Sequence, residues 1–386
     1  MRQRRFGKTN LNLSVFSLGT MRCLANPQIA TQTIARAIAL GINHLETARG
    51  YGQSETYLGL ALQDAILRSQ SVRASAQSQI YLTTKLPPTP DAQQMRLWID
   101  ESLAKLQVDY IDCLAIHGIN TWEHLSWVTN DHFLSVIQLA IAQGKIRHLG
   151  FSTHGSLDLI LAAIETDLFE FINLHYYYFW QRNHPAIALA HQKDMGVLII
   201  SPADKGGKLY TPPGKLQELC FPFTPLELNY RFLLSDRTIT TLSLGAANPD
   251  ELITPLEVAD RDYPLTCEET AVFTRLEQHL ETSLNNDLGS DLCRQCDRCL
   301  PCPEAINIPE ILRLRNLAVA YEMEDYGQYR YQMLENAGHW FPGKKGDRCT
   351  DCGDCLPRCP EKLNIPKLLR DTHQRLNGSP RRRLWS

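Results

Sequence analysis

The stretch GINHLETARGYGQSE, residues 41–55, places an acid, an arginine and a tyrosine where a strand is expected to become a loop. Alternating apolar residues predict a short strand over 44–48. Gly50 and Gly52 flank Tyr51, so the chain can turn tightly there and leave the phenol exposed beside the strand end. This arrangement is typical of a reactive site. The plain alternative is a buried ion-pair acid and a packed loop tyrosine.

Two later strands are also expected to end on ionisable side chains. The strand at 80–85 ends at Lys85, and the strand at 111–117 ends at His117. Glu46 lies in the strand at 44–48, so three successive strands carry ionisable residues. In a closed parallel barrel, the carboxyl ends of all strands open onto one face. Residues distant in sequence would therefore share a single mouth.

Strand-like runs alternate with segments of helical period along the first part of the chain. We expect strands at 14–20, 44–48, 80–85, 111–117, 148–153, 171–177, 197–202 and 240–246, with helices that include 29–40, 55–67, 91–106 and 250–259. Because no Gly-x-Gly-x-x-Gly follows the first strand, this pattern favours a (β/α)8 TIM barrel over an open doubly wound sheet. A β-hairpin turning at residues 7–10 precedes the barrel.

The ionisable side chains at this mouth suit proton transfer to a substrate carbonyl. A phenol has a reference pKa near 10, so Tyr51 is a poor acid at neutral pH unless its phenolate is stabilised. Lys85 would supply that stabilisation, and Glu46 would keep Lys85 charged and oriented. His117, when neutral, would donate a hydrogen bond to the substrate carbonyl.

These residues resemble the aldo/keto reductase family, whose pattern of Asp-Thr-Ala, Tyr-Gly and Ser-Glu is closely matched here. The resemblance implies Tyr51 as general acid, Lys85 as its activator, Glu46 in the family's aspartate position and His117 as orienter. It also implies hydride transfer between NADPH or NADH and a small carbonyl or alcohol substrate. The extra methylene of Glu46 displaces the carboxylate and leaves the level of activity open.

The resemblance further implies a cofactor site along the same mouth. The expected contacts are Gly19, Thr20, Ser152, Thr153, Asn173, Ser201, Gly207, Ser243, Gly245 and Glu251. Thr153 and Asn173 stand for the family's asparagine and glutamine. Glu251 stands where members that prefer the phosphorylated cofactor often carry arginine, and it would repel a 2′-phosphate. The choice between NADH and NADPH stays open.

An aromatic run at 176–180, YYYFW, follows the sixth strand. These side chains could line an apolar substrate pocket. Alternatively, they could be packing residues, for example against a second domain.

Eight of the twelve cysteines fall after residue 290. They form the runs Cys293-x2-Cys296-x2-Cys299-x2-Cys302-Pro and Cys349-x2-Cys352-x2-Cys355-x3-Cys359-Pro. Three cysteines at two-residue gaps followed by Cys-Pro is a ferredoxin signature, so we expect two [4Fe-4S] clusters. Paired zinc sites are the alternative, although zinc motifs usually split their ligands two and two. By resemblance to other two-cluster ferredoxins, Cys359 is expected to join the first three cysteines and Cys302 the second three.

The segment at 302–313 recurs 57 positions later at 359–370, and each copy predicts a helix after its prolines. This favours a mainly α-helical ferredoxin-like domain. The expected organisation is a barrel at 1–265, a connecting helix and linker at 266–290, the ferredoxin-like domain at 291–376 and a basic, solvated tail at 377–386.

Composition excludes several classes of partner. A net charge of −3 from 39 basic and 42 acidic residues gives no electrostatic case for nucleic acid. No run approaches the roughly 18 apolar residues of a membrane span. Arg4-Arg5 could be misread as a twin-arginine export signal, but polar residues interrupt the segment downstream of this pair. The expectation is a cytoplasmic protein with a small-molecule substrate and a redox partner protein.

Two functions remain open at this point. The first is an NAD(P)-linked oxidoreductase fused to an electron-transfer domain. The alternative is an iron–sulfur electron-transfer protein whose barrel is a non-catalytic docking scaffold. Nicotinamide gives two electrons as a hydride while each cluster takes one, and no flavin motif is visible to convert between them. The clusters could therefore use an unseen cofactor, serve an external partner or be structural.

Overall fold

The computed structural model describes residues 1–63, 79–261, 264–286 and 289–379. The chain forms two compact units. Of the described residues, one unit takes those within Met1–Gly206 and Asn229–Pro264, and the other those within Gly207–Leu228 and from Leu265 to Ser379. Residues 380–386 of the expected basic tail, which include Arg381, Arg382 and Arg383, lie outside the described residues, as does the end of the helix expected over 55–67.

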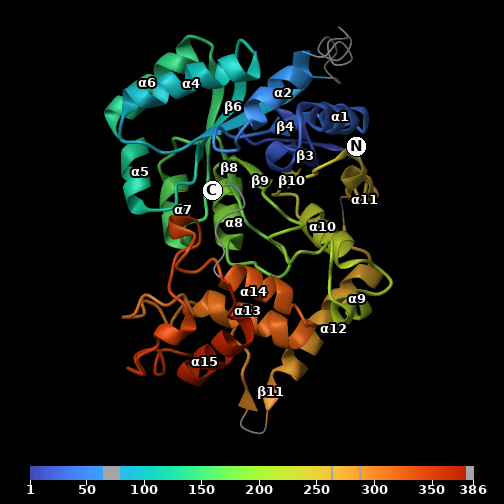
Figure 1. Cartoon of the computed structure of the whole chain (residues 1–386), viewed down its shortest axis with the longest axis vertical. Helices are drawn as coiled ribbons and strands as arrows, with labels where there is room; N and C mark the ends of the chain where they lie inside the picture. Colours follow the sequence, from blue (N-terminus) through green and yellow to red (C-terminus); the bar gives the residue numbers. More distant parts are fainter. Residues whose placement is uncertain (64–78, 262–263, 287–288, 380–386) are drawn as a thin grey trace. The chain divides into compact units, whose positions relative to one another are not determined.

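The first unit is a closed barrel of parallel strands surrounded by helices (Figure 1). Around the barrel the strands run in the order β10-β3-β4-β5-β6-β7-β8-β9. Their bounds are β3 Phe16–Gly19, β4 His44–Glu46, β5 Tyr81–Leu86, β6 Ile111–His117, β7 Ile146–Ser152, β8 Phe171–Leu174, β9 Gly196–Ile199 and β10 Thr241–Leu244. The expected (β/α)8 barrel is confirmed.

Helices follow the strands in the expected alternation. They are α1 Pro27–Ala39, α2 Ser54–Gln63, α4 Ala92–Leu106, α5 Trp122–Val128, α6 Asp131–Ala142, α7 Leu157–Glu165, α8 His184–Gln192, α10 Pro225–Ser235 and α11 Ile253–Leu256, with short 3-10 turns η1 Thr20–Arg22 and η2 Pro249–Leu252. Side chains just before several helices satisfy their first amides, as when Asp91 accepts from the amides of Gln93 and Gln94. Strands such as β6 are buried along their whole length, as expected of a parallel sheet covered on both faces.

A hairpin closes the amino-terminal end of the barrel, as the sequence predicts. Its strands are β1 Gln3–Arg5 and β2 Asn12–Ser14. Phe6 and Leu13 enter a buried cluster with Tyr81 and Phe171, which are the first residues of their strands. A Cβ atom at Gly196, the first residue of β9, would overlap the Phe6 ring. The carboxyl ends of the strands therefore form the open mouth.

The aromatic run at 176–180 packs inside this first unit. Tyr176, Tyr177 and Trp180 are buried, and the Tyr176 ring lies 5.6 Å from the ring of Phe232 on α10. The packing interpretation is therefore favoured for these three side chains.

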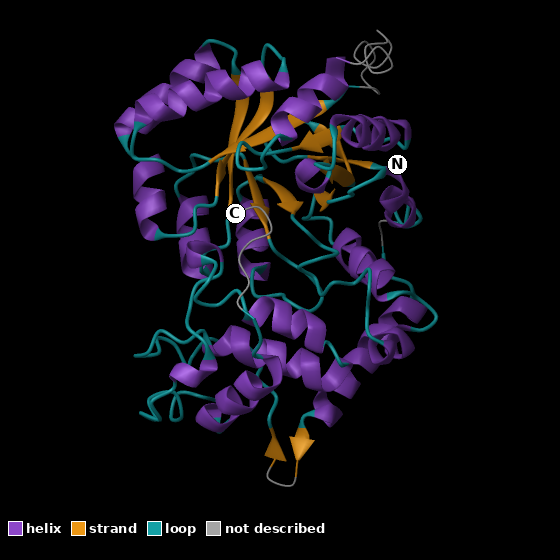
Figure 2. Ribbon diagram, in the orientation of Figure 1, coloured by secondary structure: helices purple, strands orange, loops and turns teal. Residues whose placement is uncertain are grey.

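The second unit is mainly helical, as expected, and Figure 2 shows its few strand residues in a short hairpin. Its elements are α9 Gly214–Cys220, α12 Cys267–Ser283, β11 Asn285–Asn286, β12 Gly289–Ser290, α13 Ile308–Tyr321, α14 Glu324–Tyr331, η3 Gly338–Trp340, η4 Gly346–Arg348 and α15 Ile365–Leu376. The Tyr321 hydroxyl donates to the carbonyl oxygen of Leu276 at 2.8 Å and so ties α13 to α12.

The internal sequence repeat is also a repeat of structure. Asn307 and Asn364 stand before α13 and α15, and each accepts from an amide three residues on, at 3.4 Å and 3.3 Å. Each helix carries a proline in its first turn, where the missing N–H costs no hydrogen bond.

Among the helices of the described residues, none has the length and apolar character needed to span a membrane.

Candidate functional site

The mouth of the barrel brings together side chains that lie far apart in sequence. Glu46 ends β4, Lys85 is the penultimate residue of β5 and His117 ends β6. Strand register places Gly19 beside Glu46, and His117 beside Ser152. The predicted catalytic residues therefore occupy adjacent strands at one end of the barrel.

Lys85 and Glu46 form an ion pair inside this mouth. Their side chains are only 2 % and 5 % exposed, and the Lys85 ammonium also donates to the carbonyl oxygen of Thr47 at 2.9 Å. Burial by itself lowers the pKa of Lys85, but attraction to Glu46 and Tyr51 outweighs burial, so the pKa is raised above its ordinary value. Lys85 is thus a fixed positive charge, and the longer side chain of Glu46 does not prevent the pair.

Tyr51 lies beside this charge. The Lys85 ammonium is 5.2 Å from the centre of the Tyr51 ring, and a side-chain hydrogen bond between the two contributes to the raised pKa of Lys85. The buried ring of His117 meets the Tyr51 ring edge-on at a centroid distance of 5.5 Å. The structure therefore groups a phenol, an ammonium, a carboxylate and an imidazole.

Several hydroxyls expected to contact a cofactor form hydrogen bonds within the protein. The Ser243 hydroxyl donates to Glu46 Oε1 at 2.5 Å. The Thr20 hydroxyl donates to the carbonyl oxygen of Glu46 at 3.1 Å and lies 2.6 Å from the hydroxyl of Ser54. These contacts hold the acid and its strand in place.

On the opposite side of the mouth, β7 and β8 present Ser152, Thr153 and Asn173. Ser152 Oγ accepts from the amide of Gly118 at 3.0 Å, and the Thr153 hydroxyl donates to the carbonyl oxygen of Ile119 at 2.7 Å. Asn173 is fully buried, and neither its side-chain nitrogen nor its side-chain oxygen has a hydrogen-bond partner. A buried amide without a partner is costly. The carboxamide of a nicotinamide would satisfy both atoms, so these residues fit that cofactor.

The loop after β10 contains an interaction that sequence reasoning missed. Arg22, in the turn after β3, donates to the carbonyl oxygen of Gly245 at 2.8 Å and pairs with Glu251. Its position two residues after Gly19-Thr20 is a signal that could have identified it.

The remaining two expected cofactor residues lie in different units. Ser201 adopts a left-handed backbone conformation, with φ of +52°. Gly207 belongs to the second unit, where a Cβ atom would come within 2.7 Å of the terminal carbon of Met323.

A second hydrogen-bonded chain at the mouth was also missed. The Tyr177 hydroxyl donates to the carbonyl oxygen of Ile200 at 2.5 Å and lies within hydrogen-bonding reach of His175 Nδ1. His175 Nε2 in turn lies 3.2 Å from a ring nitrogen of His154. Both histidines follow strand ends, as His117 terminates its strand, and that shared position was the available signal.

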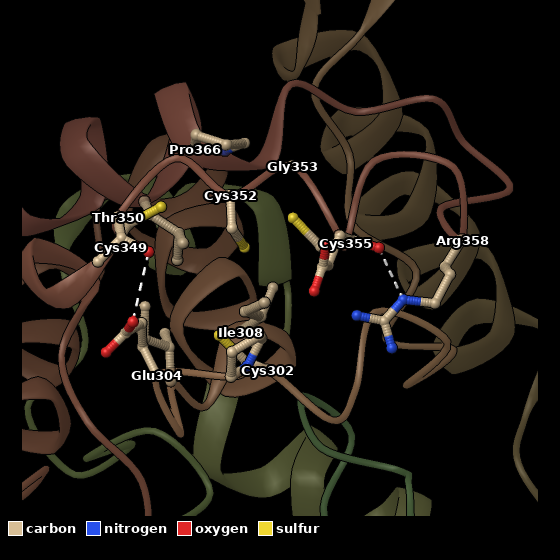
Figure 3. Close-up of a pocket in the computed structure, with 14 residues that line it drawn as sticks. Cys302, Glu304, Ile308, Cys349, Thr350, Cys352, Gly353, Cys355, Arg358 and Pro366 are labelled. Carbon is tan, nitrogen blue, oxygen red and sulfur yellow. Dashed lines mark hydrogen bonds between the residues drawn. The ribbon is translucent and has the colours of Figure 1, made fainter.

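In the second unit, four cysteines line one cavity. They are Cys302, Cys349, Cys352 and Cys355. Figure 3 shows Cys302 on one wall and the loop that carries the other three on the opposite wall. Arg358 joins the two loops by donating to the carbonyl oxygens of Leu300 and Pro301 at 2.9 Å and 3.1 Å.

A second cavity is lined by Cys293, Cys296, Cys299 and Cys359. The cysteines thus fall into the two groups that fourth-ligand exchange requires. No three His, Cys, Asp or Glu side chains in the described ranges converge closely enough to hold a single metal ion. The sulfurs instead surround cavities, which suits a multinuclear cluster held by four thiolates.

The two cysteine loops share a backbone conformation as well as a sequence pattern. Left-handed residues occur at equivalent places, namely Gln295 and Asp351, Asp297 and Gly353, and Ala305 and Lys362. Such residues turn successive amide N–H groups toward one side and create a concave surface for negative charge. The amide of Gln295, for example, donates to the sulfur of Cys293 at 3.5 Å.

The first unit is a closed parallel barrel, and the second is a helical unit with two cysteine-lined cavities. Comparison with family models agrees, since residues 16–211 match the aldo/keto reductase family and residues 292–363 match a 4Fe-4S dicluster domain. The chain belongs to the aldo/keto reductase family and carries a 4Fe-4S dicluster domain near its carboxyl end.

Individual relatives match part of the chain. The chain is 31 % identical over 166 residues to 6-dehydroglucose reductase of Novosphingobium aromaticivorans, which is 39 % of this chain and 50 % of that protein. It is 27 % identical over 155 residues to methylglyoxal reductase DkgB of Yersinia pestis, which is 40 % of this chain and 52 % of that protein. The chain therefore spans about half the length of these two relatives.

Solved structures show the same fold. Aldo-keto reductase AKR11C1 from Bacillus halodurans in its holo form superposes with a TM-score of 0.61 at 22 % identity, over 71 % of this chain and 96 % of that chain.

Proposed function

We propose that this protein reduces a small carbonyl compound, or oxidises the corresponding alcohol, with NADPH or NADH as cofactor and Tyr51 as the general acid. The observation that carries the proposal is the buried Lys85 ammonium, which is paired with Glu46 and bonded to Tyr51. A phenol beside a fixed positive charge is a stronger acid than a free phenol, because the charge stabilises the phenolate.

Each of the other side chains has a role in this proposal. Glu46 holds Lys85 in its charged form and fixes its position. His117, edge-on to Tyr51, donates to the substrate oxygen and directs it toward the phenol. When bound, the reduced nicotinamide supplies the hydride. Asn173 would hold its carboxamide, because that amide is buried and otherwise unsatisfied.

For the second unit, we propose two [4Fe-4S] clusters with exchanged fourth ligands. Cys293, Cys296, Cys299 and Cys359 would hold one cluster, and Cys302, Cys349, Cys352 and Cys355 the other. When bound, each cluster supplies one-electron transfer. One-electron chemistry suits exchange with a redox partner protein.

The decisive experiment is the Tyr51→Phe variant of the full, cluster-loaded chain, assayed by NADPH or NADH consumption against a panel of aldehydes and ketones. Loss of the general acid is expected to lower kcat about 10²- to 10⁴-fold. Iron–sulfur absorbance should stay unchanged. Tyr57→Phe, a few residues away on α2, is the matched control and should keep full activity.

Two results would contradict this proposal. Full activity in Tyr51→Phe would mean that a group other than Tyr51 protonates the substrate oxygen. A wild-type protein that consumes neither cofactor with any carbonyl would favour an electron-transfer protein with a non-catalytic barrel. Anaerobic addition of NADPH or NADH tests coupling separately, because unchanged cluster absorbance would show that the cofactor does not reduce the clusters.

A further inference from the structure

Glu46 occupies the family's aspartate position with a side chain one methylene longer. Each of its two carboxylate oxygens has a partner in the protein. Oε2 pairs with the Lys85 ammonium, and Oε1 accepts from the Ser243 hydroxyl at 2.5 Å. The side chain is 5 % exposed, so an oxygen left without a donor would be a buried unsatisfied acceptor. Ser243 therefore supplies the second anchor of the carboxylate.

Gly19 supplies the space for this arrangement. It pairs with Glu46 across β3 and β4, and a Cβ atom at position 19 would lie 2.8 Å from Glu46 Oε1 and 2.6 Å from Ser243 Oγ. Real Cβ atoms essentially never come that close to another heavy atom. Even alanine would therefore displace the carboxylate or the hydroxyl.

Backbone conformation does not explain the glycine. Gly19 has φ of −86° and ψ of 119°, which any residue can adopt. The need at position 19 is thus for room beside Glu46 and not for conformational freedom.

We propose that Gly19 and Ser243 are positioning residues that seat the longer acid of Glu46 against Lys85. Ser243 holds the far oxygen of the carboxylate, and the bare backbone at Gly19 leaves the volume that the extra methylene requires. This inference rests on the proposed reductase function. It assigns both residues to the support of the acid, where the family resemblance implied contact with the cofactor.

A double-mutant cycle of Gly19→Ala and Glu46→Asp in the cluster-loaded full chain tests the proposal. Gly19→Ala alone is expected to lower kcat about tenfold or more, because displacing Glu46 disorders Lys85. In the Glu46→Asp background the same substitution should cost less than about threefold, because the shorter carboxylate withdraws from position 19 and leaves the Ser243 hydroxyl free to rotate away. Rescue of this kind is not expected of a residue that is only structural.

Ser243→Ala provides a second, milder variant in case Gly19→Ala folds poorly. It should lower kcat when Glu46 is present and have little effect when aspartate replaces it, since the shorter side chain no longer reaches Ser243. Gly214→Ala controls for glycine replacement as such, because a Cβ atom there would meet nothing within 4 Å.

The thermal unfolding midpoint of every variant in these double-mutant cycles is also measured, because that readout needs no catalytic activity. Equal penalties for Gly19→Ala and for Ser243→Ala in both backgrounds, in kcat and in the midpoint, would overturn the inference while leaving the reductase proposal intact. Non-additive midpoints in a protein that reduces no carbonyl would support the seating of Glu46 and refute the proposed function.

Discussion

The guanidinium of Arg22 forms an ion pair with the carboxylate of Glu251, with Nη1 at 2.7 Å from Oε2. The two residues belong to the turn after β3 and the turn after β10, and their side chains are 45 % and 37 % exposed. By sequence alone Glu251 looks like a residue that repels a 2′-phosphate. Paired with Arg22, its charge is largely balanced, so the expected bias against NADPH is weakened.

Glu251→Gln should therefore raise the affinity for NADPH relative to NADH, by about three- to tenfold, because it leaves Arg22 with no carboxylate beside it. Arg22→Ala should shift the preference toward NADH. Dissociation constants from fluorescence titration at low salt measure both effects. Asp194→Asn, which breaks the somewhat more exposed pair with Arg5, is the control and should change neither constant. If both cofactors respond alike to Glu251→Gln, the pair does not face the adenosine ribose.

Removing one member of the buried pair should destabilise the barrel. Lys85→Met leaves the Glu46 carboxylate buried without its cation, and the expected loss in free energy of unfolding is about 3–5 kcal/mol. Lys85→Met combined with Glu46→Gln should recover part of the loss. Urea denaturation measures each variant. Lys145→Met, which breaks the more exposed pair with Asp100, should cost less than about 1 kcal/mol. A similar small loss for Lys85→Met would mean that Glu46 is neutral or solvated.

Below Glu46 on the same strand, His44 should make stability depend on pH. Burial lowers the pKa of His44 to about 4, and its ring nitrogens lie 2.7 Å from Ser17 Oγ and Thr83 Oγ1. An unfolded histidine has a pKa near 6.5 and so binds protons more readily than folded His44. The stabilising contribution is therefore present above about pH 6.5 and declines as pH falls, by about 1.5 kcal/mol between pH 6.5 and 5.

Replacing His44 by asparagine should remove this part of the pH dependence, as measured by urea denaturation between pH 5 and 7. The exposed His132→Asn is the control and should keep the wild-type slope. Iron–sulfur absorbance is followed in parallel, so that cluster loss is not mistaken for unfolding. An unchanged slope in His44→Asn would mean that His44 binds protons as readily in the folded protein as in the unfolded chain.

Cluster ligation predicts effects that cross between the two cysteine runs. Cys302→Ser should disturb the cluster held by Cys349, Cys352 and Cys355, and Cys359→Ser the cluster held by the first run. Each variant should lose about half of the iron and should change a different paramagnetic signal. Cys267→Ser, at an exposed cysteine outside both cavities, should keep all of the iron. If Cys302→Ser and Cys359→Ser change the same signal, the ligand exchange is wrong.

The sequence by itself determined the barrel, the hairpin at its amino-terminal end and the ferredoxin-like helices. Strand periodicity, helix caps and the spacing of the cysteines are local properties, so they can be read along the chain. The same holds for the ends of β4, β5 and β6, because parallel closure places their last residues at one mouth whatever the details of packing.

Only the tertiary structure decided which groups hold Glu46 and which cation faces Glu251. Ser243 bonds Glu46 across 197 residues, and Arg22 pairs with Glu251 across 229 residues. Both contacts exist because barrel closure pairs the last strand, β10, with the first, β3. A local sequence pattern carries no information about which atoms lie within 3 Å of each other at such separations. The neighbours of the hydroxyls and glycines that resembled cofactor contacts could therefore be identified only from the tertiary structure.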